Sequence, residues 1–315
     1  MQEHKPVFST SAPGKVMLCG EYFVLWGASA LAFPARHRQF LNVFYQPEKQ
    51  THSWITRVGE EIIFSCEIDK SSLEVQNIRG SLDSAKYIES LIKAVLQINP
   101  EAFSHSYRFE TLLTFRPEWG LGSSSSLIVN MARFADVDPF ALHRMISRGS
   151  GYDVACALFE KPLLFKNPEK PEISFPEINY NFIECLHFLP LNIKKDSQKA
   201  VKDILSKQIS PQALAIASKL SESLSQVTDF NLFTNLLNEY VHLVEKQLGL
   251  SNPAKELFRG FQGTIKPLGA WGGDLMLVAS QEKENYIKDY FGAKGFKTII
   301  KWHDIIELPQ KYVKP

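Results

Sequence analysis

The chain has 315 residues, of which 44% are hydrophobic and 22% are charged, and its formal net charge is +1. This length predicts two domains or two joined lobes, and the composition is typical of a globular protein with a large core. A net charge so close to zero argues against binding nucleic acid or a membrane through a general electrostatic field.

The sequence carries no sign of export or membrane insertion. Residues 1–6 are polar and lack the apolar core of a signal peptide, and no run approaches the roughly 18 apolar residues of a membrane span. The four cysteines form no CxxC pair and stand at no metal-ligand spacing with histidine. We therefore expect free thiols and a cytoplasmic location.

Strands are expected to dominate the first half of the chain. Residues 8–35 predict a strand, a glycine-bearing turn and a second strand. Further strands are expected at 41–45, 62–68 and 106–115. Apolar residues recur at helical spacing over 84–97. A turn with Pro117 and Gly120 follows, and a helix is expected to open at the serine run behind it.

The second half is expected to be more helical. Helices are predicted at 197–207, 211–226, 230–248 and 253–261, and short strands at 275–280 and 298–302. Four prolines gather within 162–176, which places the boundary there and predicts lobes 1–165 and 166–315. The mixture of strands and helices in two lobes indicates the α+β class.

The strongest single motif is the run Gly120-Leu121-Gly122-Ser123-Ser124-Ser125-Ser126, between an expected strand and an apolar helix. Glycines let a backbone approach a polyphosphate closely, and successive N–H groups can surround its oxygens. The helix N-terminus adds unpaired donors and a positive dipole end. A serine-rich helix cap without a ligand would show the same run, and the absence of a lysine after the glycines excludes a Walker A loop.

Three weaker motifs accompany this loop. The first is Ser11-Ala12-Pro13-Gly14-Lys15, followed by Gly20-Glu21-Tyr22, where a lysine after a turn can present its charge to a cleft or to solvent. The second is Gly149-Ser150-Gly151-Tyr152-Asp153. Its acid could orient and deprotonate an attacking hydroxyl or simply complement a helix dipole. The third is Gly269-Ala270-Trp271-Gly272-Gly273-Asp274, whose glycines allow either close packing on a ligand or a plain turn.

Together and in this order, the four motifs resemble the galactokinase–homoserine kinase–mevalonate kinase–phosphomevalonate kinase (GHMP) superfamily, over residues 8–280. The segments 20–25 and 150–155 are similar to the phosphomevalonate kinase pattern, as is Gly273-Asp274, whereas Trp271 stands where the family usually has glycine. The resemblance implies a two-lobed α+β fold, with a left-handed β-α-β unit in the N-terminal lobe and a C-terminal α/β lobe.

The resemblance also implies roles for the motif residues. ATP would bind along 120–126, and Ser124 would supply a hydroxyl to Mg²⁺. Asp153 would act as the catalytic base, while Lys15 would stabilise the transferred charge and keep Asp153 ionised. Acceptor contacts are expected from Lys15, Glu21, Tyr22, Arg148, Ser150, Gly151, Gly272 and Gly273. The basic residues considered for an anionic acceptor are Arg36, His37, Lys86 and Arg148.

The implied activity is ATP-dependent phosphoryl transfer to an intermediate of the mevalonate pathway of isoprenoid synthesis, with 5-phosphomevalonate as the favoured acceptor. The alternatives within enzymes are mevalonate kinase or another GHMP small-molecule kinase. The alternative outside them is a nucleotide-binding regulatory protein, against which the presence of Lys15 and Asp153 speaks. We expect a small anionic acceptor as partner, no nucleic acid or membrane, and a monomer or homodimer.

Overall fold

The computed structural model describes residues 5–191, 204–269, 271 and 275–308. The chain divides into two compact units that alternate along the sequence. The first contains Met1–Gly14, His37–Arg116 and Gly122–Leu158, and the second contains Lys15–Arg36, Pro117–Leu121 and Phe159–Pro315. The last change of unit, at 158/159, lies near the expected boundary at 165/166, but two earlier segments also join the second unit. The lobes 1–165 and 166–315 stay a prediction.

A sheet forms the framework of the first unit, in the order β5-β4-β3-β6-β2, and β1 also pairs with β2. The central strands β3 and β6 run parallel, whereas the other neighbouring pairs on this path are antiparallel. The strands are β1 (Phe8–Cys19), β2 (Ala30–Tyr45), β3 (Thr51–Val58), β4 (Glu61–Asp69), β5 (Val75–Arg79) and β6 (Tyr107–Leu113). The two longest, β1 and β2, each begin in one unit and end in the other.

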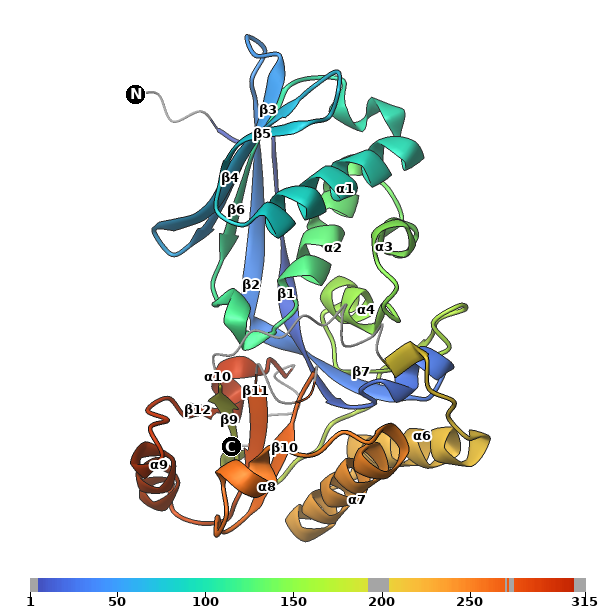
Figure 1. Cartoon of the computed structure of the whole chain (residues 1–315), viewed down its shortest axis with the longest axis vertical. Helices are drawn as coiled ribbons and strands as arrows, with labels where there is room; N and C mark the ends of the chain where they lie inside the picture. The colour runs from blue at the N-terminus through green and yellow to red at the C-terminus, as the bar shows by residue number, and fades with distance from the viewer. Residues whose placement is uncertain (1–4, 192–203, 270, 272–274, 309–315) are drawn as a thin grey trace. The chain divides into compact units, whose positions relative to one another are not determined.

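Helices of the first unit lie on one side of this sheet (Figure 1). They are α1 (Leu82–Ile98), α2 (Ser123–Ala135), α3 (Pro139–Ile146) and α4 (Tyr152–Phe159), with the short 3₁₀ helix η2 (Pro100–Phe103) after α1. Ile88, Leu91 and Val95 of α1 are buried at helical spacing. They share a core with Trp54 and Phe109, whose stacked rings have centroids 5.1 Å apart. Burial of this apolar face stabilises the packing of the helices on the sheet.

The second unit contains a smaller antiparallel sheet with the order β10-β11-β9-β12. Its strands are β9 (Leu186–Pro190), β10 (Thr264–Pro267), β11 (Leu275–Ala279) and β12 (Ile300–Lys301). Its helices are α6 (Pro211–Gln226), α7 (Phe230–Leu248), α8 (Ala254–Leu257), α9 (Glu284–Ala293) and α10 (Trp302–Ile305). The first part of β2 pairs here with β7 (Leu163–Lys166), which pairs with β8 (Glu172–Ser174). The same unit also contains the short 3₁₀ helices η1 (Phe23–Trp26), η3 (Pro117–Trp119) and η4 (Ile183–Cys185).

The structure confirms the α+β class and most of the predicted elements. Helices α6 and α7 span 211–226 and 230–248 as expected, because Ser210 and Asp229 cap their first turns. The helix expected at 253–261 ends at Leu257, and Gly260 then takes a positive φ. Helices α3 and α9 were not predicted. The helix expected at 197–207 lies mostly outside the described residues. The handedness of the crossover from β3 to β6 stays a prediction.

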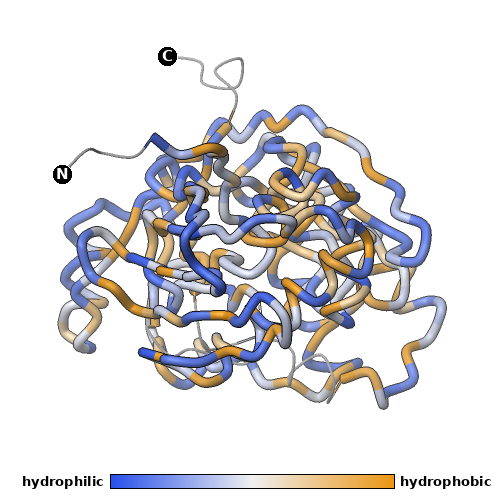
Figure 2. The backbone as a smooth tube through the Cα atoms, turned by 90° about the horizontal axis from the view of Figure 1, so that it is seen from above, coloured by the Kyte–Doolittle hydropathy of each residue, from blue (hydrophilic) through white to orange (hydrophobic). Residues whose placement is uncertain are grey.

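Hydrophobic residues recur at short intervals along helices and strands instead of forming one long run (Figure 2). Within the described parts of the chain, no helix is both long enough and apolar enough to cross a membrane.

Candidate functional site

Two glycines shape the loop in front of α2. Gly120 has φ 66° and Gly122 has φ 82°, so both lie in the left-handed region that glycine enters without steric cost. The N–H of Gly120 donates to the carbonyl of Pro117 (3.2 Å), which closes the preceding turn. Gly122 is the residue from which α2 starts. The glycine spacing seen in the sequence therefore serves a local backbone requirement, while the approach of a polyphosphate to this loop stays a prediction.

The N-terminus of α2 presents its backbone donors without a capping side chain. In the same unit, Ser81 caps α1 and Asp138 caps α3, whereas no side chain among the described residues caps α2. The first N–H groups of a helix have no partner within it. Together with the helix dipole, such donors form a site for an anion, and phosphate is a common occupant.

The four serines of the loop are not equivalent. The Ser125 hydroxyl donates to the carbonyl of Gly122 (2.8 Å), and the Ser126 hydroxyl donates to Oε1 of Gln39 (2.7 Å). Both side chains are buried, so these hydroxyls stabilise the loop internally. Ser123 is half-buried and Ser124 is exposed. The hydroxyls that remain accessible to a ligand therefore belong to the first two serines.

Magnesium is the cofactor ion that the loop implies, and the donor set fits it. Mg²⁺ usually binds through substrate phosphates, water and one or two protein oxygens, without a cage built entirely from protein ligands. The exposed hydroxyl of Ser124 at the start of α2 can supply one such oxygen. Within the described ranges, no group of three or more His, Cys, Asp or Glu side chains could hold a metal by itself.

Asp153 lies in the first turn of α4, in the same unit as α2. One carboxylate oxygen accepts a hydrogen bond from the N–H of Val154 (3.0 Å). Two side chains that the sequence did not single out are coupled to this charge. Burial raises the pKa of the Tyr87 phenol, and Asp153 raises it further. Burial lowers the pKa of His143, and the attraction of Asp153 opposes that change.

Tyr87 contacts the serine loop. Its hydroxyl donates to the carbonyl of Ser124 (3.1 Å) in the first turn of α2. His143 packs against the segment that leads to Asp153, since a Cβ placed on Gly151 would lie 3.5 Å from the His143 ring nitrogen Nδ1. Tyr87 therefore contacts the start of α2, and it is near enough to Asp153 for that charge to raise its pKa. In the sequence, Tyr87 stood out only as one of the residues at helical spacing on α1. That spacing predicts burial of the side chain but no role in the site.

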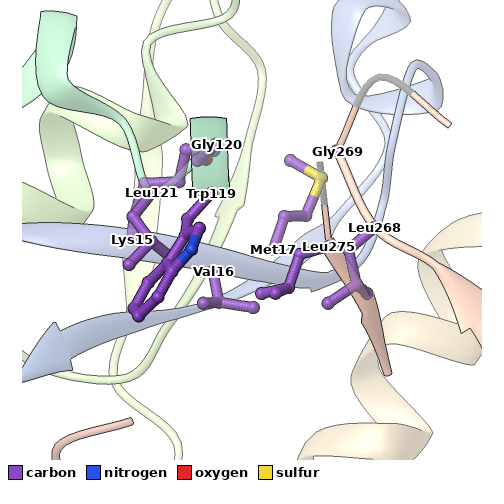
Figure 3. A pocket seen from close by; sticks show the side chains of 9 residues that line it. All are labelled: Lys15, Val16, Met17, Trp119, Gly120, Leu121, Leu268, Gly269 and Leu275. Atoms are coloured by element: carbon purple, nitrogen blue, oxygen red, sulfur yellow. The ribbon is translucent and has the colours of Figure 1, made fainter. Parts of the chain in front are cut away.

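Lys15 lies in the second unit, bonded to the other half of the loop. Its N–H donates to the carbonyl of Leu121 (2.7 Å), and its ammonium donates to the carbonyl of Gly120 (2.9 Å). These residues belong to the wall of a small pocket (Figure 3). The rest of the wall is Val16, Met17, Trp119, Leu268, Gly269 and Leu275. The predicted pairing of Lys15 with Asp153 stays a prediction.

The other expected acceptor residues differ in exposure. Arg148 is exposed, whereas Ser150 and Tyr22 are both 8% exposed. Glu21 is 5% exposed, and its carboxylate pairs with Lys266. Among the basic candidates, Arg36 and Lys86 are exposed and His37 is half-buried. Gly272 and Gly273, like Asp274, lie outside the described residues. Roles of all these residues in binding an acceptor stay predictions.

Trp271 is the residue at which the third motif differs from the superfamily that the sequence resembles, which usually has glycine there. The residue has φ 55°, in the left-handed region where glycine is normally preferred, and its side chain is 6% exposed. Tryptophan therefore keeps the backbone conformation of a glycine at this position. The unfavourable φ is offset by the burial of a large aromatic side chain.

We expect Gly122→Val to weaken ATP binding by more than tenfold, or more than about 1.4 kcal/mol. A β-branched residue disfavours the left-handed φ of Gly122, and its side chain would obstruct the approach of phosphate to α2. Isothermal titration with a non-hydrolysable ATP analogue measures the change. Gly59→Val is the control, since Gly59 also has a positive φ but a Cβ placed there would meet no described atom within 4 Å. Unchanged affinity in folded Gly122→Val protein would contradict a role of this loop.

Comparison with known proteins identifies the fold. No protein-family model and no curated protein sequence matches the chain. Solved structures match it over almost its whole length. One is the Streptococcus pneumoniae phosphomevalonate kinase in complex with phosphomevalonate and AMPPNP (18% identity, TM-score 0.67, 93% of this chain and 99% of that chain).

Two further solved structures with this fold are complexes with other small molecules. The L. major mevalonate kinase in complex with R-mevalonate is 17% identical, with a TM-score of 0.68 over 97% of this chain and 99% of that chain. The Lactococcus lactis galactokinase complexed with galactose is 12% identical, with a TM-score of 0.60 over 95% of this chain and 93% of that chain. The chain has the fold that these small-molecule kinases share, which confirms the resemblance seen in the sequence at the level of the fold.

Proposed function

We propose that the chain is an ATP-dependent small-molecule kinase of the GHMP type, acting in the mevalonate pathway with 5-phosphomevalonate as its preferred acceptor. The single observation that carries the proposal is the uncapped start of α2 behind Gly120 and Gly122, in a fold shared with kinases. A match of that fold binds AMPPNP, an ATP analogue. Phosphoryl transfer needs a phosphate cradle, a metal ion and a few positioned charges. These residues can supply the cradle, a hydroxyl ligand for the metal ion and the charges.

The proposed mechanism assigns a separate task to each side chain. The N–H groups at the start of α2 bind the phosphates, and the Ser124 hydroxyl would hold Mg²⁺, which would supply positive charge beside them. The ammonium of Lys15, which donates to the carbonyl of Gly120, would stabilise the negative charge of the transferred phosphoryl group. Asp153 orients the acceptor oxygen and takes its proton where that oxygen carries one.

The acceptor decides how much proton transfer the reaction requires. A phosphate monoester has its second pKa near 6, so its attacking oxygen is mostly deprotonated at neutral pH. An alcohol keeps its proton until the transition state. With mevalonate, Asp153 therefore acts as a base throughout, whereas with 5-phosphomevalonate it can orient only the acceptor fraction whose phosphate still carries a proton.

We expect kcat/KM to be higher with 5-phosphomevalonate than with mevalonate, because segments 20–25 and 150–155 resemble the phosphomevalonate kinase pattern. Coupled assay of ADP release with 5-phosphomevalonate, mevalonate, homoserine and galactose tests this ranking. A clear preference for mevalonate would make mevalonate kinase the better assignment. Mevalonate kinase is the second candidate because the L. major enzyme matches the fold about as well as the phosphomevalonate kinase does. ATP binding without ADP release would instead support a regulatory protein.

A further inference from the structure

Lys266 forms a buried ion pair in the second unit, outside every role assigned above. Its side chain is 1% exposed and that of Glu21 is 5% exposed, and the ammonium donates to Oε1 of Glu21. The ammonium also donates to the carbonyl of Pro267 (3.1 Å) and lies 5.2 Å from the ring centroid of Tyr240. Removing one partner of a buried pair leaves an uncompensated charge in the interior.

The pair is attached to a strained turn. Tyr22 has φ 65° and ψ −51°, a conformation that non-glycine residues rarely adopt. The N–H of Phe23 closes this turn on the carbonyl of Glu21 (2.8 Å), and the same carbonyl accepts a bond from the Tyr240 hydroxyl (2.9 Å). Such strain persists only where surrounding contacts determine the conformation. Here the side chain of Glu21 is held by Lys266 and its carbonyl by Tyr240.

Lys266 also joins this turn to the start of the third glycine-rich motif. It is a residue of β10, which ends at Pro267, and its ammonium bonds to the carbonyl of that proline. The next two residues, Leu268 and Gly269, line the pocket that Lys15 also borders (Figure 3). One ammonium therefore binds the turn after β1 and the strand end that leads into the pocket wall.

We propose that Lys266 is a positioning residue for the acceptor, which holds the Glu21–Tyr22 turn and the Pro267–Gly269 segment in the arrangement that binds it. This inference rests on the proposed kinase function, because it assumes that Glu21 and Tyr22 contact the acceptor. It adds a residue from β10 that no motif in the sequence identified.

The charged and titratable groups around Glu21 come from several elements. Burial raises the pKa of the Glu21 carboxyl, and Lys266 opposes that rise. Burial raises the pKa of Cys19 on β1 to about 12, with a further contribution from Glu21. Burial also raises the pKa of Tyr240 on α7. Since Cys19 and Tyr240 stay neutral near pH 7, Lys266 is the group that compensates the Glu21 charge.

The test compares Lys266→Met with the double variant Glu21→Gln/Lys266→Met. Lys255→Met is the control, because Lys255 pairs with Glu245 at the surface of the same unit. For Lys266→Met we expect the KM for the acceptor to rise at least tenfold. The KM for ATP should change less than about threefold, since the two residues to which the ammonium donates, Glu21 and Pro267, lie outside the 120–126 loop. The control should match the parent protein in both constants.

A pH profile separates positioning from a general loss of structure. In Lys266→Met, the buried Glu21 carboxyl has lost the charge that opposed its raised pKa, so it stays protonated until higher pH. Its ionisation would then force it out of the interior, and kcat/KM for the acceptor should fall as pH rises through that pKa. The double variant has no such group, so its profile should lack this fall.

Each outcome decides the question. An unchanged acceptor KM and pH profile in Lys266→Met, with only a lower Tm, would overturn the proposal and leave the kinase function intact. If Lys266→Met does not fold, the double variant carries no unpaired buried charge, and an acceptor KM equal to that of the parent would overturn the proposal. Titration of the parent protein with 5-phosphomevalonate and with mevalonate is the further measurement. Absence of binding and of turnover with either would overturn the mevalonate-pathway assignment, and the inference with it.

Discussion

Asp153→Asn is expected to lower kcat by about 10²–10⁴-fold, the span for one positioned acid–base group, while ATP affinity changes little. Asparagine keeps the size and hydrogen-bonding shape of the side chain but removes the charge that orients the acceptor. The loss should lie at the upper end of this span for an alcohol acceptor and at the lower end for a phosphate acceptor. Single-turnover measurement on the folded variant isolates the chemical step.

The control for this variant is Asp138→Asn. Asp138 caps α3 by accepting from the N–H groups of Phe140 and Ala141, and asparagine is also a good cap. Its kcat should equal that of the parent protein. If Asp153→Asn also stays within a few-fold of the parent, Asp153 acts only as a residue of the helix start.

Lys15→Met should slow the chemical step to a similar degree as Asp153→Asn. The double variant should lose less than the product of the two single losses, because residues that serve one transition state are not additive. Fully multiplicative losses would indicate that Lys15 and Asp153 act independently. That result would contradict their predicted pairing. The separate role of each residue would then be judged from its single variant alone.

Gly20→Ala is expected to destabilise the protein by about 4 kcal/mol or more, a value reached only by severe changes. Gly20 has φ 112°, and a Cβ there would lie 2.3 Å from Cβ and 2.4 Å from Cα of the buried Ala30. The clash is with the start of β2 and cannot be relieved by rotating a side chain. A lower Tm, by roughly 6 °C or more for a chain of this size, is the expected measurement.

Gly260→Ala provides the control for Gly20→Ala. Gly260 also has a positive φ, of 80°, in the same unit, but a Cβ added to it would have no neighbour within 4 Å among the described residues. Its cost should be limited to the left-handed backbone, about 1–2 kcal/mol. If both variants lost the same amount, the steric contact with Ala30 would contribute nothing. Gly20 precedes Glu21 and Tyr22, so a folded Gly20→Ala protein should also bind the acceptor more weakly.

Features that depend on neighbouring residues could be predicted from the sequence. The bounds of α6 and α7 follow from apolar spacing and from Ser210 and Asp229 as caps, and the structure reproduces them. The left-handed backbone at Gly120 and Gly122 follows from the glycines themselves. The order of the motifs predicted the fold. For the helix bounds and the glycines, the interactions that decide the structure act within a few residues of the chain, so the local sequence contains them, whereas the fold was predicted through the family resemblance.

Only the tertiary structure decided which groups of the site are available and which are occupied. Ser126 gives its hydroxyl to Gln39, 87 residues away, and Tyr87 reaches the carbonyl of Ser124 from another helix. Lys266 and Glu21 are separated by 245 residues, yet they form one buried ion pair. No spacing rule connects such residues, because their partners are chosen by the packing of sheets and helices. Burial then fixes these contacts, since a polar group removed from water must find a partner within reach.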